Sequence, residues 1–288
     1  MPTTYTHYKF GKEVLEALPR PLKESIETHR QLYDIGVHGP DILFYIRSPF
    51  KKNVRKTGTG LHHQSSVAFF EHAKEVISNT ADSEAEKAYI YGCVTHFVLD
   101  SECHKYVEKM IEVSGVGHNE IETEFDAYLL KQERKNPIKY KRTKHIEPSA
   151  YNAKIIAPFY NHLEIKTMPT KENVQKTITA LDVRRSILAQ LSIHKLLTAK
   201  TPIKRRVLYF LTGLMKDKDA IRGLIVNETP NPKCADYNEL LKKIYSGAIP
   251  LAVSLIMQYQ KYLQNGDALS PRFNQTYDEG DNWRNVVL

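Results

Sequence analysis

The chain has 288 residues with a formal net charge of +8, 41% hydrophobic residues and three cysteines. This length allows one large or two smaller domains with a sizeable core. The cysteines are too few and too scattered for a disulfide framework or a CxxC zinc site, so we expect reduced thiols in a cytoplasmic protein, with Cys93 packed in the core. The sequence has no uncharged apolar run approaching about 18 residues and no apolar segment near its start, so we expect neither a transmembrane segment nor a signal peptide.

The positive charge gathers in three clusters, at residues 51–56, 131–145 and 204–206. Clusters of this kind attract the phosphates of nucleic acid or of anionic membrane lipids. They are also typical of solvated loops and helix ends, which is the interpretation that we prefer. Peripheral contact with an anionic membrane or with nucleic acid through these loops is the alternative.

Helical periodicity and turn residues divide the first part of the chain into helices. We expect helices at residues 4–17, 21–32 and 61–77, then a long helix from residue 84 to the SGVG break at 114–117, and a further helix at 118–130. Gly36, Gly39 and Pro40 predict a turn just before Asp41. The basic, glycine-containing residues 51–60 predict a mobile loop. Ser83 and Glu86 have the spacing of a capping box for the long helix.

After residue 131 the sequence predicts a basic connector and then more helices. We expect these helices at residues 151–163, 171–200, 203–215 and 236–263. Pro250 lies inside the last of them and predicts a kink or a break. The segment from residue 264 onward has the composition of a tail that wraps over the surface. Convincing strand alternation occurs nowhere in the sequence, so the predicted class is all-α.

The most informative stretch is AYIYGCVTHFVLDSECHKYVEKM, which starts at Ala88. In it His96, Asp100 and His104 follow one another at intervals of four, and His118 and Glu122 repeat this interval after the glycine-rich break. Residues four apart lie on one face of a helix, so each pair directs two potential ligands to the same region.

The surroundings of these polar residues favour a metal site. Residues 89–99 are almost continuously apolar, as in a helix that is buried on most sides. A histidine and an aspartate placed there need a charged or hydrogen-bonding partner, because burying them alone costs several kcal/mol. Imidazole and carboxylate groups without cysteine suit Zn²⁺, with other borderline divalent ions as alternatives.

The strings YGCVTHFVLDSECH and GHNEIETEFD together resemble the zinc-dependent phospholipase C and S1/P1 nuclease superfamily. That family has HxxxD on one long helix, a histidine shortly after it, and HxxxE on the next helix. THYKFGKEVLEAL is similar to its early histidine-bearing helix, GVHGPD to its aspartate turn, and GLHHQSS to its next histidine. The resemblance covers about residues 4–130 in five ordered pieces. It implies a multi-helical phospholipase C/P1 nuclease-like bundle, with residues 1–135 as a metal-binding core and residues 136–288 completing the same domain.

The resemblance also implies a cluster of one to three zinc ions. The implied ligands of the first ion are Asp41, His62, His96 and Asp100, and those of the second are His104, His118 and Glu122. His7 would help to hold a third ion, with Asp100 bridging. Between His62 and His63 we favour His62 as the ligand, with His63 as its support. Asp41 is implied either as a ligand or as the catalytic general base.

Family chemistry is the hydrolysis of phosphoric esters by water that zinc activates. The implied substrate is a phosphoester, either a phospholipid headgroup or a smaller soluble phosphodiester. A P1-like nuclease and a non-catalytic helical protein stabilised by zinc are the alternatives. The chain departs from the secreted members in two respects: it starts with Met1 and Pro2, and no proline separates Asp100 from His104. The second departure predicts a straight helix through both residues.

Overall fold

The computed structural model describes residues 4–45, 52–81, 83–147, 149–160 and 231–280. Its α-helices, in chain order, are α1 (Thr4–Ala17), α2 (Arg20–Thr28), α3 (Arg30–Gly36), α4 (Lys52–His62), α5 (Val67–Ser78), α6 (Glu84–Ser114), α7 (His118–Gln132), α8 (Ala150–Ile156) and α12 (Ala235–Asn265). Short 3-10 helices are η1 (Gly39–Tyr45), η3 (Ala157–Tyr160), η4 (Pro232–Cys234) and η5 (Pro271–Asn274). These residues contain no β-strand, so the predicted all-α class is confirmed. The helices predicted at 171–200 and 203–215 lie outside the described residues.

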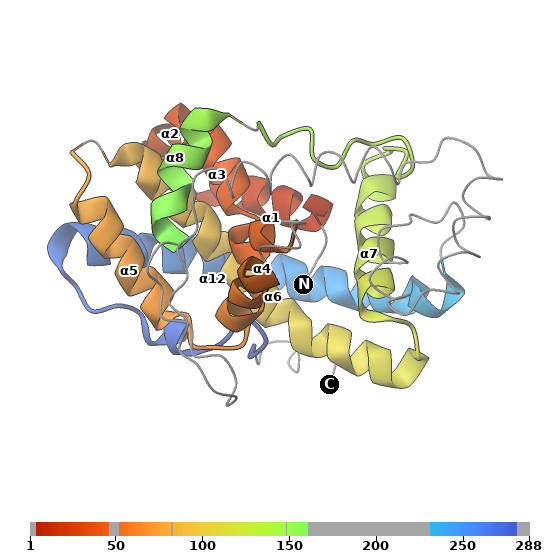
Figure 1. Ribbon diagram of the computed structural model, residues 1–288. Coiled ribbons are helices and arrows are strands. Elements are labelled where there is room, and N and C mark those ends of the chain that lie inside the picture. The colour runs from red at the N-terminus through yellow and green to blue at the C-terminus, as the bar shows by residue number, and fades with distance from the viewer. Residues whose placement is uncertain (1–3, 46–51, 82, 148, 161–230, 281–288) are drawn as a thin grey trace.

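Helix α6 is the central element of the fold. Figure 1 shows it in the middle of the molecule, and it contacts α1, α2, α3, α7, α8 and α12. Every residue from Tyr89 to Cys103 is buried, because this part of the helix is apolar on nearly all sides. His96 and Asp100 are carried into the interior with it, and both are fully buried. The helix is unbroken through Asp100 and His104, as the sequence predicts.

Helices α3 and α6 cross at two glycines. A Cβ atom on Gly36 would lie 2.1 Å from the carbonyl oxygen of Tyr89, and one on Gly92 would lie 2.5 Å from the carbonyl oxygen of Tyr33. Real Cβ atoms do not approach backbone oxygens this closely. The two backbones therefore come together only because neither position has a side chain, and this fixes the turn that follows α3 against α6.

We expect Gly36→Ala to destabilise the protein by about 3 kcal/mol, because the added methyl group forces two packed backbones apart. Gly247→Ala is the matched control, since a Cβ atom there meets nothing within 4 Å. Alanine is the better helix former, so the control should gain roughly 0.5–1 kcal/mol. Urea unfolding of both variants measures the difference, and equal stabilities would contradict the close crossing.

The segment around residues 51–66 differs from its predicted structure. Lys52–His62 form α4 instead of the expected mobile loop, and the expected helix at 61–77 begins only at Val67. α4 packs on η1, and its last turns bury Thr57, Gly58 and Leu61. Packing of this kind stabilises a helix whose glycines and charges give it poor intrinsic propensity. As a result His62 lies at the end of one helix and not at the start of another.

Two further helix boundaries differ in detail. The predicted helix at 21–32 is interrupted at His29, which has φ −119° and ψ 35° and separates α2 from α3. Ser83 is the N-cap of α6 as predicted, but its side chain makes no capping hydrogen bond. The prediction of the capping position was right and that of the capping box was wrong.

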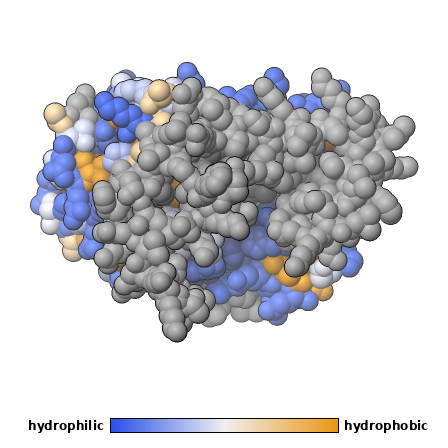
Figure 2. Space-filling view, viewed as in Figure 1, coloured by the Kyte–Doolittle hydropathy of each residue, from blue (hydrophilic) through white to orange (hydrophobic). Residues whose placement is uncertain are grey.

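Helix α12 continues through Pro250 without a break. Pro250 and Ser246, whose carbonyl loses its helical donor, are both exposed, so water can satisfy that carbonyl. Residues Pro232–Asn265 are long and apolar enough to cross a membrane, but this is weak evidence because a core helix of a soluble protein has the same property. α12 packs against α6 and α1, and Figure 2 shows a mostly hydrophilic described surface on the visible face. The absence of a transmembrane segment stays a prediction.

Residues 271–280, which we call the C-terminal strap, return to the side of α6. Phe273 and Tyr277 are buried there, with Phe273 against the ring of Phe70 and Tyr277 against that of Phe97. The guanidinium group of Arg272 donates to Glu102 of α6. Residues 271–280 of the expected surface tail are thus packed against α6, and they lie beside the residues that carry the site.

Candidate metal centre

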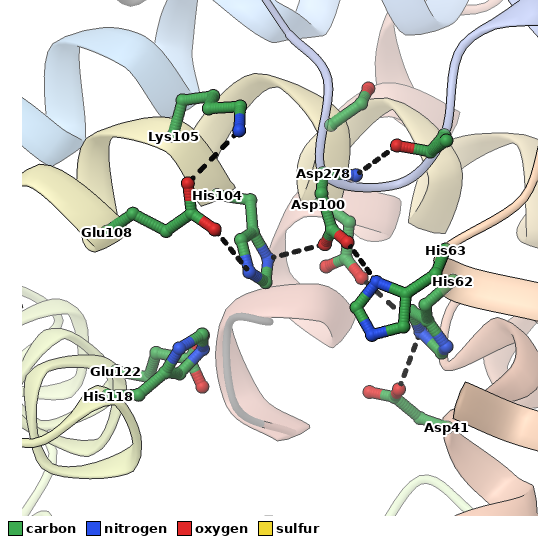
Figure 3. Close-up of polar contacts among 12 residues, drawn as sticks. Asp41, His62, His63, Asp100, His104, Lys105, Glu108, His118, Glu122 and Asp278 are labelled. Atoms are coloured by element: carbon green, nitrogen blue, oxygen red, sulfur yellow. Dashed lines mark hydrogen bonds and ion pairs between the residues drawn. The ribbon is translucent and has the colours of Figure 1, made fainter. Parts of the chain in front are cut away.

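Five polar side chains from four elements meet beside α6. His7 comes from α1, Asp41 from η1, His62 from the end of α4, and His96 and Asp100 from α6 itself. At most 7% of each residue is exposed. Figure 3 shows His62 between Asp41 and Asp100. The structure therefore brings together the residues that the sequence suggested for the first ion, together with His7.

Asp100 is at the centre of this group. Its Oδ1 atom lies 3.2 Å from Nε2 of His7, and its Oδ2 atom lies 3.3 Å from Nε2 of His96 and 3.7 Å from Nε2 of His62. Oδ1 of Asp41 lies 3.2 Å from Nε2 of His62. Two ligand atoms on a tetrahedral zinc are roughly 3.3 Å apart, since each lies about 2.0–2.1 Å from the metal. Three of the four observed separations, at 3.2–3.3 Å, match this spacing, and the fourth is 3.7 Å.

The residues present fit a metal ion. Asp41 Oδ1, His62 Nε2, His96 Nε2 and both carboxylate oxygens of Asp100 are buried and make no hydrogen bond within the described part of the chain. A buried carboxylate without hydrogen bonds is destabilising by several kcal/mol, and a cation among these atoms offsets that penalty. Two sets have ligand atoms that all lie within 4.8 Å of one another: His7 with Asp41 and His96, and His62 with His96 and Asp100.

The surrounding backbone orients two of the imidazoles. Nδ1 of His62 lies 2.7 Å from the carbonyl oxygen of Gly58, which can only accept, so Nδ1 carries the proton and the lone pair of Nε2 faces the centre. Gly39 has φ +44°, and a Cβ atom there would lie 2.3 Å from the ring of His96. The GVHGPD turn can therefore lie directly against this ring only with glycine at position 39.

Burial shapes the charge of the centre. The pKa of His96 is lowered well below its usual value by burial, against the opposing effect of Asp100, so its ring is neutral and can donate a lone pair at neutral pH. The pKa of Asp41 is raised to about 6 by burial, although the nearby imidazole of His62 lowers it. Both shifts result mainly from burial, and a bound cation would favour neutral imidazole and ionised carboxylate.

The residues suggested for a second ion lie next to one another at the α6–α7 junction. Nε2 of His118 is 2.8 Å from Oε1 of Glu122, and the ring centroids of His104 and His118 are 5.0 Å apart. The pKa of Glu122 is lowered even though burial raises it, with His118 as the largest opposing cause. These three residues form a group distinct from the one around Asp100, and their role as ligands stays a prediction.

His62 and His63 point in different directions. His62 faces Asp41 and Asp100, whereas His63 has a 53% exposed side chain and donates from Nδ1 to Oδ2 of Asp278 at 2.7 Å. Figure 3 shows His63 turned toward Asp278 and His62 turned toward Asp41. The geometry thus favours His62 over His63 as the ligand.

Two residues near the centre were missed from the sequence. Asp126 accepts hydrogen bonds from the backbone N–H groups of Tyr5 and Thr6, and so holds the start of α1 and with it His7. It lies four residues after Glu122, so the HxxxExxxD spacing was an available signal. Asp278 comes from the C-terminal strap, and no local pattern connects it with the histidines.

Comparison with known proteins agrees with this arrangement. The family model described as zinc dependent phospholipase C matches residues 6–168, more than half of the chain. No curated protein and no solved structure is matched by the chain. The match includes all five residues of the group around Asp100 and the whole of α7. The chain therefore belongs to the zinc-dependent phospholipase C family.

Proposed function

We propose that this protein is a zinc-dependent hydrolase of phosphoric esters of the phospholipase C type. The observation that carries the proposal is the buried carboxylate of Asp100, which makes no hydrogen bond among the described residues and faces three imidazole nitrogens at 3.2–3.7 Å. Membership of a zinc-dependent family supports the same ion. Zinc, when bound, stabilises negative charge on phosphoryl oxygens and lowers the pKa of water so that it can attack phosphorus.

The chain's own residues have separate roles in this proposal. His62, His96 and Asp100 hold one ion, with Asp41 as a further ligand or as the base that accepts the proton of the attacking water. His7 adds to the site through Asp100, the bridging carboxylate. His104, His118 and Glu122 hold a second ion at the α6–α7 junction. Gly58 and Asp126 fix His62 and α1 in place.

The substrate that we propose is a phosphodiester with a small headgroup, either in a phospholipid or in a smaller soluble molecule. The family description supports the lipid, and the proposed cytoplasmic location favours the soluble ester. The exposed lysines of the basic connector, among them Lys131, Lys139 and Lys144, add attraction to an anionic surface.

A second function is favoured by one observation. Every residue of the group around Asp100 is buried, as in a structural metal site with protein ligands at every position. In that case zinc stabilises the packing of α1, η1, α4 and α6 without turnover.

Hydrolysis assays separate the two functions. Zinc-loaded protein should release phosphocholine from a short-chain soluble phosphatidylcholine, or p-nitrophenol from a p-nitrophenyl phosphodiester. Asp100→Asn should lower either rate by at least about 10²-fold, since it removes the bridging carboxylate. Asp267→Asn, at an exposed aspartate, is the matched control and should leave the rate unchanged. Stoichiometric zinc without hydrolysis of any ester would contradict the enzyme and support the structural role.

A further inference from the structure

The C-terminal strap brings a carboxylate to the edge of the metal centre. Asp278 has a 15% exposed side chain and lies between the imidazoles of two residues that are far apart in the sequence, His63 and His104. Its Oδ2 atom is 2.7 Å from Nδ1 of His63 on the segment that follows α4, and its Oδ1 atom is 3.3 Å from Nδ1 of His104 on α6. Figure 3 shows the carboxylate of Asp278 between the two rings, on the C-terminal strap where it passes over α6.

Both contacts are made through Nδ1, and this determines which nitrogen of His104 is available to a metal. An ionised carboxylate only accepts hydrogen bonds, so Nδ1 of His63 carries the proton of its hydrogen bond to Asp278, and the 3.3 Å contact with Oδ1 favours a proton on Nδ1 of His104 as well. A neutral imidazole protonated on Nδ1 presents its lone pair on Nε2. Nε2 of His104 lies on the side of the ring away from Asp278, where Glu108 is 4.0 Å away, and the ring of His104 lies 5.0 Å from that of His118. A carboxylate that orients a histidine in this way is a common support for metal-binding imidazoles.

The strap is held firmly enough to place Asp278. The backbone N–H of Tyr277 donates to the carbonyl of His62 at 3.2 Å, and the Tyr277 ring packs against His62 and His96. The backbone N–H of Asp278 donates to Oγ1 of Thr276 at 3.2 Å. On the other side, a Cβ atom on Gly280 would lie 1.8 Å from the carbonyl oxygen of Ser101, so the strap lies directly on α6. Asp278 is thus held in place by its neighbours Tyr277 and Gly280, which both pack against the site or α6.

We propose that Asp278 is a positioning residue that orients His104 toward the second ion, so that the C-terminal strap completes a metal centre whose ligands all lie within the family match at residues 6–168. This inference rests on the proposed binding of zinc by His104, His118 and Glu122. The strap connects this group with the first one, because Tyr277 packs on His62 and His96 while the next residue contacts His104. His63 braces the carboxylate from the solvent side.

Zinc binding by Asp278→Ala tests the inference without any assay of turnover. We expect the wild-type chain to bind at least two ions and the variant to bind one of them about 10–100-fold more weakly, the usual effect of losing an outer carboxylate. The measurement is zinc per chain by plasma mass spectrometry after dialysis against buffers of fixed free zinc. Asp278→Asn keeps one acceptor oxygen, so its affinity for this ion should lie between those of the wild type and of Asp278→Ala. Asp267→Ala, an exposed aspartate in the same C-terminal segment, is the matched control.

Cobalt substitution gives a second readout that a merely structural role would not change. The visible spectrum of the cobalt protein should lose or shift the component of the second ion in Asp278→Ala, while the component from the group around Asp100 is retained. Thermal unfolding of the metal-free proteins checks the fold, and it should differ little between the variant and the control. If the wild type binds two ions and Asp278→Ala binds both with unchanged affinity and spectrum, this inference is overturned and the proposed function stands. If the wild type binds fewer than two, the two-ion centre fails and the inference with it.

Discussion

Asp100→Asn is expected to change stability in opposite directions with and without zinc. In the metal-free protein both oxygens of Asp100 are buried without hydrogen bonds among the described residues, so removing the charge should be neutral or stabilising. In the wild type, zinc at 100 to 1,000 times its dissociation constant should add roughly 3–4 kcal/mol, because it binds only the folded chain. The variant loses the ligand that His7, His62 and His96 all face, and should lose most of this gain.

Thermal unfolding at pH 8, with and without zinc, measures this effect. That pH is above the usual pKa of histidine, so that proton competition for the imidazole ligands is small. Asp267→Asn serves as the control and should retain the full zinc-dependent rise in midpoint. If Asp100→Asn keeps the full rise, Asp100 is not a ligand.

Asp126→Ala is expected to destabilise the metal-free protein by about 3–5 kcal/mol. The Asp126 carboxylate accepts from the backbone N–H of Thr6 at 2.8 Å, from its hydroxyl at 2.6 Å and from the N–H of Tyr5 at 3.2 Å. It also pairs with the buried guanidinium of Arg142 at 3.3 Å. Its removal leaves a buried cation without this counter-charge and the first turn of α1 without this acceptor.

Urea unfolding of metal-free Asp126→Ala and Asp126→Asn measures this loss. Asn retains an acceptor oxygen for the backbone of α1 but not the charge for Arg142, so its destabilisation should be smaller. Because α1 carries His7, we also expect weaker zinc binding in the alanine variant. A loss below about 1 kcal/mol in Asp126→Ala would show that the start of α1 is held by other contacts.

The parts of the fold that were predicted correctly have strong local signals. α1 spans Thr4–Ala17 as expected from its apolar spacing, and α6 and α7 are separated at the glycine-rich break, where Gly115 has φ +66°. The pairing of His96 with Asp100 and of His118 with Glu122 follows directly from the four-residue spacing on a helix. In these cases sequence neighbours are also spatial neighbours.

The errors occur where tertiary packing decides. Residues 51–60 were expected to form a loop because they contain two glycines and many charges, yet Lys52–His62 form α4, which packs on η1. A propensity argument does not contain this packing, since η1 and α4 have no shared pattern in the sequence. Once α4 has formed, the helix itself brings the carbonyl of Gly58 to His62, four residues later.

Contacts between residues far apart in the sequence could not be predicted from local patterns either. Asp278 contacts His63 across 215 residues and lies in a segment that was expected to be a surface tail. His145 is buried with its Nε2 2.8 Å from Nε2 of His38 and its ring stacked on Tyr8, both of which are more than 100 residues away in the sequence. Each of these pairs depends on how the chain returns to α6, which periodicity does not encode.

The most direct test of zinc binding at the centre is the metal content of tag-free wild-type protein, determined by plasma mass spectrometry beside His96→Ala and His118→Ala. We predict about two to three zinc ions per wild-type chain and a stepwise loss, with each variant losing the ion of its own group. His72→Ala, which changes a histidine of α5 away from both groups, should leave the content unchanged. No zinc in the wild type, even after reconstitution with zinc, would contradict the metal centre and leave its histidines as core residues.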